Sequence, residues 1–207
     1  MTTEHDTIKS DDRREYFRLD DEVLLDYARI DETQIAALRE RIFDRVVDRF
    51  SVAATFATSS RTMSRILSSF SAGQPDLARY LKMMDQKLNQ LARLFVIEEM
   101  NAGEHSVTQV NLSAGGVVFP STTEFSPDDM LQLRLALLPA MTGILAIVRV
   151  IYCERSAQGN GLPWQVAVEY EHIRESDRDL IASHLMAREA ERLRERREQE
   201  QEGGSGE

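Results

Sequence analysis

The chain has 207 residues, of which 42% are hydrophobic and 29% are charged, a composition typical of a soluble globular protein with room for one domain and an elaboration. Its formal net charge of −10 argues against general nucleic-acid binding, which needs a basic surface. The polar N-terminus shows no signal peptide, and the single cysteine, Cys153, excludes an intrachain disulfide, so we expect a cytoplasmic protein.

The first motif is a cluster of arginines in a polar N-terminal arm. Arg14 and Arg18 are four residues apart, Arg13 lies beside Arg14, and the apolar run Val23–Ile30 that follows predicts a strand. A guanidinium pairs with phosphate through a fork of donors, bonds guanine O6 and N7, and stacks on bases. The cluster therefore predicts a site for a ligand with phosphates and flat polar edges.

The same four-residue spacing recurs in segments with helical periodicity. The copies are Arg41/Arg45/Arg49, Arg61/Arg65, Arg174/Arg178 and Arg188/Arg192/Arg196. In a helix this spacing places side chains on one face. We interpret these copies as solvent-exposed helix surface.

The sequence pattern over residues 31–103 predicts a helical insertion. Asp31 can cap a helix, with Gln34 three residues later completing a capping box. Apolar residues with helical spacing follow in two groups, Ile35, Leu38, Ile42, Val46 and Phe50, then Met63, Ile66, Leu67 and Phe70. Gly73 and Pro75 then predict a stop and a restart.

The second helix of the insertion is predicted over Asp76–Met100. Six apolar residues, which we call the heptad seam, alternate steps of four and three as in a coiled coil: Leu77, Leu81, Met84, Leu88, Leu91 and Phe95. Either the helical arms fold into a hairpin on the rest of the domain, or the seam pairs between chains. We favour oligomerisation, because this apolar surface has little else to cover it.

The second motif is a tight turn between two apolar runs, Asn111–Gly116. Gly115 and Gly116 permit positive φ and a close approach of a ligand to the backbone. Asn111 and Ser113 can satisfy the turn amides, or can present an amide and a hydroxyl to a base edge.

The chain after this turn predicts antiparallel strands. Segments with two-residue alternation, separated by turn residues, are Met130–Leu138, Ile144–Glu154 and Trp164–Ile173. So many short strands within one small domain predict a barrel. The most apolar window, Leu135–Val148, is too short to span a bilayer and is interrupted by Pro139.

A C-terminal helix is expected to begin near Asp177, because Ser176–Asp179 predicts a capping box. Its apolar face fades after Met186. Arg188–Glu202 is mostly charged or Gln and either extends the helix through Glu–Arg pairs or frays.

No constellation for catalysis is evident. The four histidines show no metal-ligand spacing with one another or with Cys153: His5, His105, His172 and His184. Neither a nucleophile–base arrangement nor a phosphate-binding loop is present. We therefore expect no enzyme, no metal and no cofactor.

In this order, the two motifs resemble those of the PilZ domain, a bacterial receptor for cyclic di-GMP. The family pattern is Arg-x-x-x-Arg before the first barrel strand, then Asp/Asn-x-Ser-x-x-Gly in a later strand turn. Arg14 and Arg18 match the first part. Asn111, Ser113 and Gly116 match the second.

The resemblance implies a mainly β fold, a six-stranded antiparallel PilZ-like barrel with a long helical insertion and a C-terminal helix. It covers about residues 11–30 and 104–185. The expected organisation is an arm and first strand over 1–30, the insertion over 31–103, the remaining barrel over 104–175, and a helix with a charged tail over 176–207.

The resemblance also implies a function in signal transduction. The arginines Arg13, Arg14 and Arg18 would grip phosphates and guanines, Asn111 and Ser113 would read a guanine edge, and Gly115 and Gly116 would complete the site. Binding would signal to an unidentified downstream protein. Atypical family members with inserted helices assemble as tetramers by a coiled coil, which implies a tetramer or dimer here. The alternative is a PilZ-like scaffold that binds no nucleotide and assembles through its helices.

Overall fold

The computed structural model describes residues 16–43, 73–100, 107–156 and 161–203, together with Phe56, Ser59, Ser60, Met63, Ile66 and Leu67. Several residues used in the sequence predictions lie outside these described residues: Arg13, Arg14, Arg45, Arg49, Arg61, Arg65, Val46, Phe50 and Phe70.

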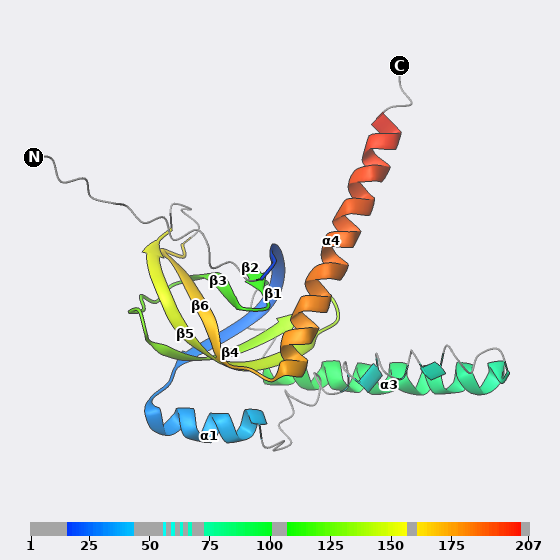
Figure 1. Ribbon diagram of the computed structural model, residues 1–207, viewed down its shortest axis with the longest axis horizontal. Coiled ribbons are helices and arrows are strands. Elements are labelled where there is room, and N and C mark those ends of the chain that lie inside the picture. The colour runs from blue at the N-terminus through cyan, green and yellow to red at the C-terminus, as the bar shows by residue number, and fades with distance from the viewer. Residues whose placement is uncertain are drawn as a thin grey trace, which may run out of the picture.

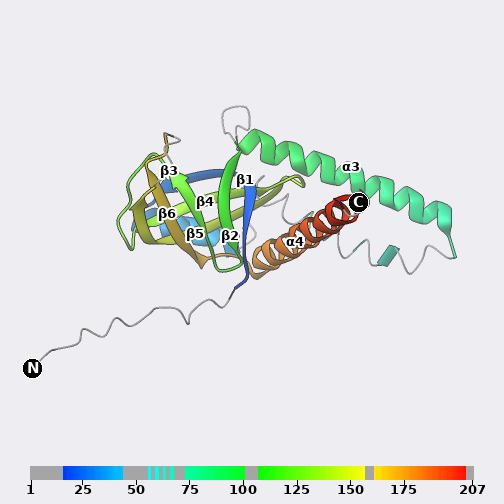
Figure 2. The ribbon, with the colours of Figure 1, turned by 90° about the horizontal axis from the view of Figure 1, so that it is seen from above.

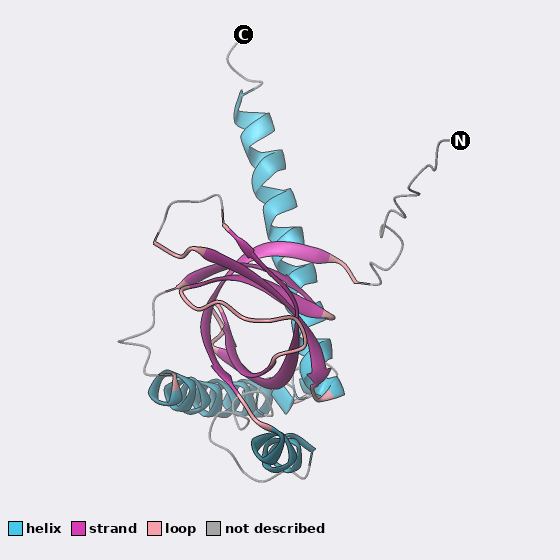
Figure 3. Cartoon of the chain, turned by 90° about the vertical axis from the view of Figure 1, so that its left-hand side faces the viewer, coloured by secondary structure: helices cyan, strands magenta, loops and turns pink. Residues whose placement is uncertain are grey.

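Six antiparallel strands form a closed barrel in the described residues, as the sequence predicted (Figures 1 and 3). They are β1 (Arg18–Arg29), β2 (Thr108–Ser113), β3 (Gly116–Ser121), β4 (Met130–Leu137), β5 (Thr142–Arg155) and β6 (Trp164–His172). Around the barrel the order is β1-β2-β3-β6-β5-β4. Because β1 pairs with both β2 and β4, the helical insertion that follows β1 in sequence does not interrupt the closed sheet.

The barrel interior is filled by the alternating residues of the strands. Leu131, Leu133, Leu135 and Leu137 of β4 are all buried, as are Val166, Val168 and Tyr170 of β6. Side chains two apart on a strand share a face, so each strand contributes one apolar row to the interior. Burial of a leucine side chain stabilises the fold by about 1.5–3 kcal/mol.

The strand β1 begins at Arg18, five residues before the predicted Val23. Its first half alternates exposed and buried residues, but Asp21 occupies one of the buried positions. Because Asp21 is polar, the alternation of β1 could not be recognised in the sequence before Val23.

Two helices of the insertion cover the outside of the barrel. The helix α1 (Glu32–Phe43) begins with the predicted capping box, since Asp31 Oδ1 accepts from Gln34 N at 2.9 Å and Gln34 Oε1 accepts from Asp31 N at 2.9 Å. Buried residues of α1, of the helix α3 (Pro75–Glu99) and of the outer barrel face form a second core: Leu38, Ile42, Ala92, Val96, Met100, Leu24, Ala136, Leu145 and Ile147.

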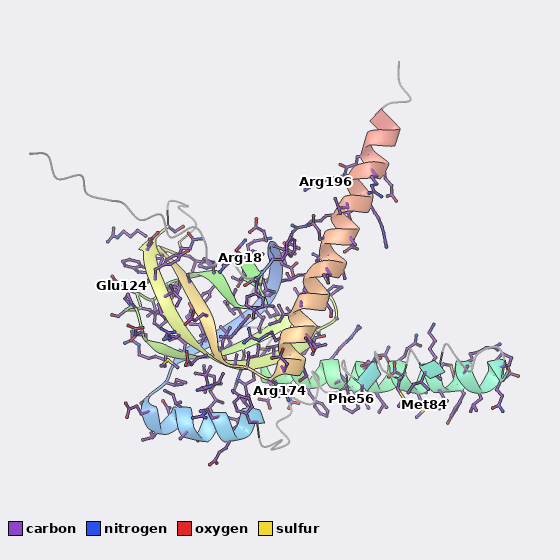
Figure 4. The ribbon with its side chains drawn as sticks, in the orientation of Figure 1. Arg18, Phe56, Met84, Glu124, Arg174 and Arg196 are labelled. Carbon is purple, nitrogen blue, oxygen red and sulfur yellow. The ribbon has the colours of Figure 1, made fainter. Side chains whose placement is uncertain are left out.

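Most of α3 projects away from the barrel (Figures 1 and 2). Its buried residues, Ala92 and Val96, belong to its C-terminal part. The opposite end of the helix, which includes Met84 (Figure 4), extends beyond the sheet.

The helix α4 (Glu175–Gly203) begins two residues before the predicted start. Ile181 and Leu185 are buried in the main core, which fixes its first turns to the barrel. The helix continues through the charged segment to Gly203, beyond the barrel, and Arg196 lies on this free part (Figure 4). Among the described residues, no helix is both long and apolar enough to cross a membrane.

Candidate ligand site

The pairing of β1 with β2 brings Arg18 of the first motif next to the second motif. Arg18 lies opposite Ser113 and Asp20 lies opposite Asn111 in the strand register, so their Cα atoms are about 4.5–5.5 Å apart. Asn111 Nδ2 donates to Asp20 Oδ1 at 2.7 Å. The exposed side chain of Arg18 is seen at this edge of the barrel in Figure 4.

Between β2 and β3 the chain reverses at Ser113–Gly116, which we call the motif turn. The Ser113 hydroxyl accepts from the Gly115 and Gly116 amides at 3.2 and 3.1 Å and donates to the Gly116 carbonyl at 3.0 Å. Ser113 is 1% exposed. Of the two roles left open by the sequence, this conformation uses Ser113 to close the turn, whereas Asn111 is half-buried at the surface.

The two glycines of the motif turn have different roles. A Cβ on Gly116 would lie 2.1 Å from the Val168 carbonyl oxygen, whereas a Cβ on Gly115 would lie 2.7 Å from Tyr16 Cδ2. Neither glycine has a φ in the left-handed region, so close approach accounts for both residues. Gly116 allows β3 to approach β6, and Gly115 allows the arm to approach the turn.

An arginine of α4 completes this corner of the molecule. Arg178 Nη1 donates to the Ala114 carbonyl oxygen at 2.5 Å, and its guanidinium carbon lies 5.8 Å from the centroid of the Tyr16 ring. The motif turn therefore has the arm on one side and α4 on another.

The interpretation of the C-terminal arginines as solvated surface is wrong for four residues, one just before α4 and three within it. Arg174 pairs with the buried carboxylate of Asp177 at 2.9 Å, and Arg178 bonds the motif turn. Arg188 Nε donates to Asp21 Oδ1 at 3.1 Å, and Arg192 donates to the Asp20 carbonyl. Their spacing placed them on one helix face, but sequence alone could not show that β1 and the turn lie against that face.

The carboxylate of Asp21 anchors α4 to β1. His184 Nε2 lies 2.5 Å from its second oxygen, and the Asp21 side chain is fully buried. Burial alone raises the pKa of Asp21, but the hydrogen bond and charge of His184 and the hydrogen bond from Arg188 outweigh it and hold the pKa below its ordinary value. Nothing in the sequence singled out either Asp21 or His184 for this contact.

An apolar groove of about 600 Å³ lies beside the motif turn, between the arm and α4. Its walls include Tyr16 and Phe17 on one side and Leu185, Met186 and Leu193 on the other. Phe17 is 56% exposed and Met186 is 73% exposed, so Tyr16 and Phe17 cover this face of α4 only in part.

The heptad seam of α3 is largely exposed in the single chain. The exposed fractions are 50% for Leu77, 43% for Leu81, 40% for Met84, 40% for Leu88 and 54% for Leu91, and Phe95 is half-buried. The described residues of the preceding segment pack beside α3, with Ser60 Oγ donating to Asp85 Oδ2 at 2.6 Å. Met63 and Ile66 line a shared groove of about 310 Å³ with Leu77 and Leu81. Thus described residues of the preceding segment pack against α3, but most of α3 projects away from the barrel (Figure 1).

Comparisons with known proteins identify a family model that matches part of the chain. The family model described as PilZ domain matches residues 92–187, which contain the motif turn and the first turns of α4 but neither the arm nor β1. No curated protein sequence matches the chain.

Two solved structures are similar to the chain. A pathogenic protein from Xanthomonas campestris, described as a new tetrameric PilZ domain self-assembled via an unusual helical bundle, has a TM-score of 0.55 and 11% identity, and the match covers 86% of this chain and 91% of that chain. The Bacillus subtilis inhibitor of motility (MotI/DgrA) has a TM-score of 0.37 and 20% identity, covering 42% of this chain and 44% of that chain. The first comparison shows a shared fold.

Proposed function

With the PilZ domain match over residues 92–187 as the premise, we propose that this protein is a non-enzymatic receptor for cyclic di-GMP. The ligand binds where the arm meets the motif turn. The observation that carries the proposal is the β1–β2 register, which puts Arg18 opposite Ser113. Arg18 and the motif turn are distant in the sequence but meet at one edge of the barrel, which supports a single ligand contacting both.

The charges at this edge suit an anionic nucleotide. Arg18 is exposed, and Arg178 lies beside the turn, within a chain whose formal net charge is −10. Guanidinium groups form forked hydrogen bonds with phosphate and with guanine O6 and N7. Arg13 and Arg14 precede β1 by a few residues, and we propose that they bind the ligand as the arm orders over it.

Arg18→Ala is expected to weaken binding of cyclic di-GMP roughly 10- to 150-fold, the loss of about 1.5–3 kcal/mol for a charge-assisted hydrogen bond. Arg14→Ala should have an effect of similar size. Titration calorimetry on the purified full chain measures both. The control is Arg79→Ala on α3, whose side chain is 75% exposed and pairs with exposed Asp76, and it should bind as the wild type does.

The same titration tests the function itself. A wild type that gives no heat with cyclic di-GMP at high micromolar concentration would refute the receptor function and favour a scaffold. Full affinity in both Arg14→Ala and Arg18→Ala would mean that the ligand binds elsewhere.

We further propose that the protein self-associates through the heptad seam, as a dimer or tetramer. Support comes from the exposure of Leu77, Leu88 and Leu91 and from the shared fold with a protein described as a tetramer assembled by a helical bundle. A coiled-coil period in exposed apolar residues is the pattern expected of a helix that packs on another copy. The oligomer would then present several ligand sites, and their occupancy would be transmitted to a protein partner.

Leu88→Asp is expected to reduce the mass in solution to that of a single chain, because it places a charge in the middle of the seam. Light scattering coupled to size exclusion measures the mass. Leu94→Asp is the matched control, since Leu94 is 58% exposed on the same helix but is not a seam residue. An unaltered mass in Leu88→Asp would exclude the seam as the interface.

A further inference from the structure

The ring of Tyr16 packs against the motif turn, and we call the space that it fills the slot. Its Cδ2 and Cε2 atoms lie 2.7 and 3.2 Å from where a Cβ of Gly115 would be, so the ring rests directly on the glycine backbone. The guanidinium of Arg178 lies over the ring at 5.8 Å from its centroid. The Tyr16 ring therefore contacts both a glycine backbone and a planar cation.

The walls of this slot are held in place by the barrel and α4. The Gly115 carbonyl accepts from Tyr170 N of β6 at 3.0 Å, and Arg178 donates to the Ala114 carbonyl at 2.5 Å. Arg178 also approaches Glu175 of its own helix, at 3.8 Å. The slot therefore persists without Tyr16.

Tyr16 is held less firmly than Gly115 and Arg178, the residues that line the slot. Tyr16 precedes Arg18, the first residue of β1, and is 41% exposed. An exposed cation–π contact contributes about a factor of two to five to an equilibrium. A ligand whose aromatic ring stacks more strongly in the slot would therefore displace Tyr16.

We propose that the slot between Gly115 and Arg178 is a guanine-base subsite that Tyr16 fills in the free protein. The inference rests on the proposed function and adds to it a residue that competes with the ligand. A planar guanine base can stack on a guanidinium as the Tyr16 ring does. Ligand binding expels Tyr16 and thereby changes a wall of the groove between the arm and α4.

The first test is the affinity of Tyr16→Ala for cyclic di-GMP. Removing the competing ring should tighten binding about two- to fivefold, because the binding-competent fraction rises. Tyr152→Ala is the control, since Tyr152 is 40% exposed on β5, which is separated from β3 by β6, and its affinity should equal that of the wild type. Equal or weaker binding by Tyr16→Ala overturns the subsite.

The second test changes the opposite wall. Arg178→Lys keeps the charge and a donor for Ala114 but loses the planar fork. We expect about tenfold weaker binding in the Tyr16→Ala background, on the scale of a lost stacking contact. The loss should be smaller when Tyr16 is present, because the substitution also weakens the contact that holds the competing ring. Unchanged affinity overturns the assignment of Arg178.

The third test observes the ring directly. In the free protein, NMR should show a nuclear Overhauser contact between the Tyr16 ring and the Gly115 α-protons, and saturation with cyclic di-GMP should abolish it. A contact that persists at saturation overturns the subsite while leaving the receptor function intact. Absence of binding by both the wild type and Tyr16→Ala would instead refute the receptor function.

Discussion

Gly116→Ala is expected to lower the free energy of unfolding by roughly 3 kcal/mol or more, a large part of the stability of an ordinary domain. The new Cβ would lie 2.1 Å from the Val168 carbonyl oxygen and 3.0 Å from Glu169 Cα. Both atoms are backbone atoms of β6, and Gly116 is paired with Glu169 in the ladder. Relief of the clash must separate β3 from β6, and this opens the barrel.

Urea unfolding followed by circular dichroism measures the loss, and Gly115→Ala provides the matched control. At Gly115 the added Cβ meets the side chain of Tyr16, which precedes β1 and can move away. Gly115→Ala should therefore lower the free energy of unfolding by less than about 1 kcal/mol. Wild-type stability in Gly116→Ala would contradict the close approach of β3 to β6.

The barrel was predictable because strand alternation is a local property of the sequence. The inward row of β4, from Leu131 to Leu137, could be identified before any partner strand was known. The start of β1 could not, because Asp21 is buried by contacts with His184 and Arg188, residues that lie far away in the sequence. From sequence alone an aspartate is predicted to be exposed, because the partners that allow its burial are not yet known.

Only part of the candidate site could likewise be predicted from the sequence. Its motif residues were recognisable by type and order, but Arg178 was not, because its spacing from Arg174 repeats elsewhere in this arginine-rich chain. The placement of α4 against the motif turn gives Arg178 its role. Similarly, the periodicity of α3 identified apolar residues without showing that Ala92 and Val96, rather than the seam, face the barrel.

Asp21→Ala is expected to lower the free energy of unfolding by roughly 2–3 kcal/mol and to loosen α4. Removal of one partner from a buried ion pair costs about 3–5 kcal/mol. The expected loss is smaller here because the Arg188 side chain is 31% exposed and can be solvated once the carboxylate is gone. Hydrogen exchange should accelerate in the α4 turns that contain His184 and Arg188.

Glu22→Ala is the control for this substitution, because the neighbouring Glu22 is exposed on the same strand. Its side chain accepts one hydrogen bond, from Gln109 at 2.6 Å. The expected change is within about 0.5 kcal/mol, with no change of exchange in α4. Equal effects of the two substitutions would mean that the buried carboxylate contributes nothing specific to α4.

The pH dependence of the Asp21→Ala effect separates the ion pair from simple packing. Since the pKa of Asp21 is lowered in the folded protein, its stabilisation is present above the unfolded pKa of about 3.9 and is lost as the pH falls through the folded value. The other buried carboxyl, Asp177, has the opposite shift, because burial raises its pKa. Its contribution is present in acid and is lost as the pH rises.

Subtracting the unfolding free energy of Asp21→Ala from that of the wild type at each pH cancels the Asp177 contribution. The difference should shrink as the pH falls from about 5 to below about 4. A difference that stays constant down to pH 2.5 would assign the loss to packing alone. A difference that shrinks in acid means that α4 is held on β1 by charge, and that protonation of one buried carboxylate releases the helix lying against the motif turn.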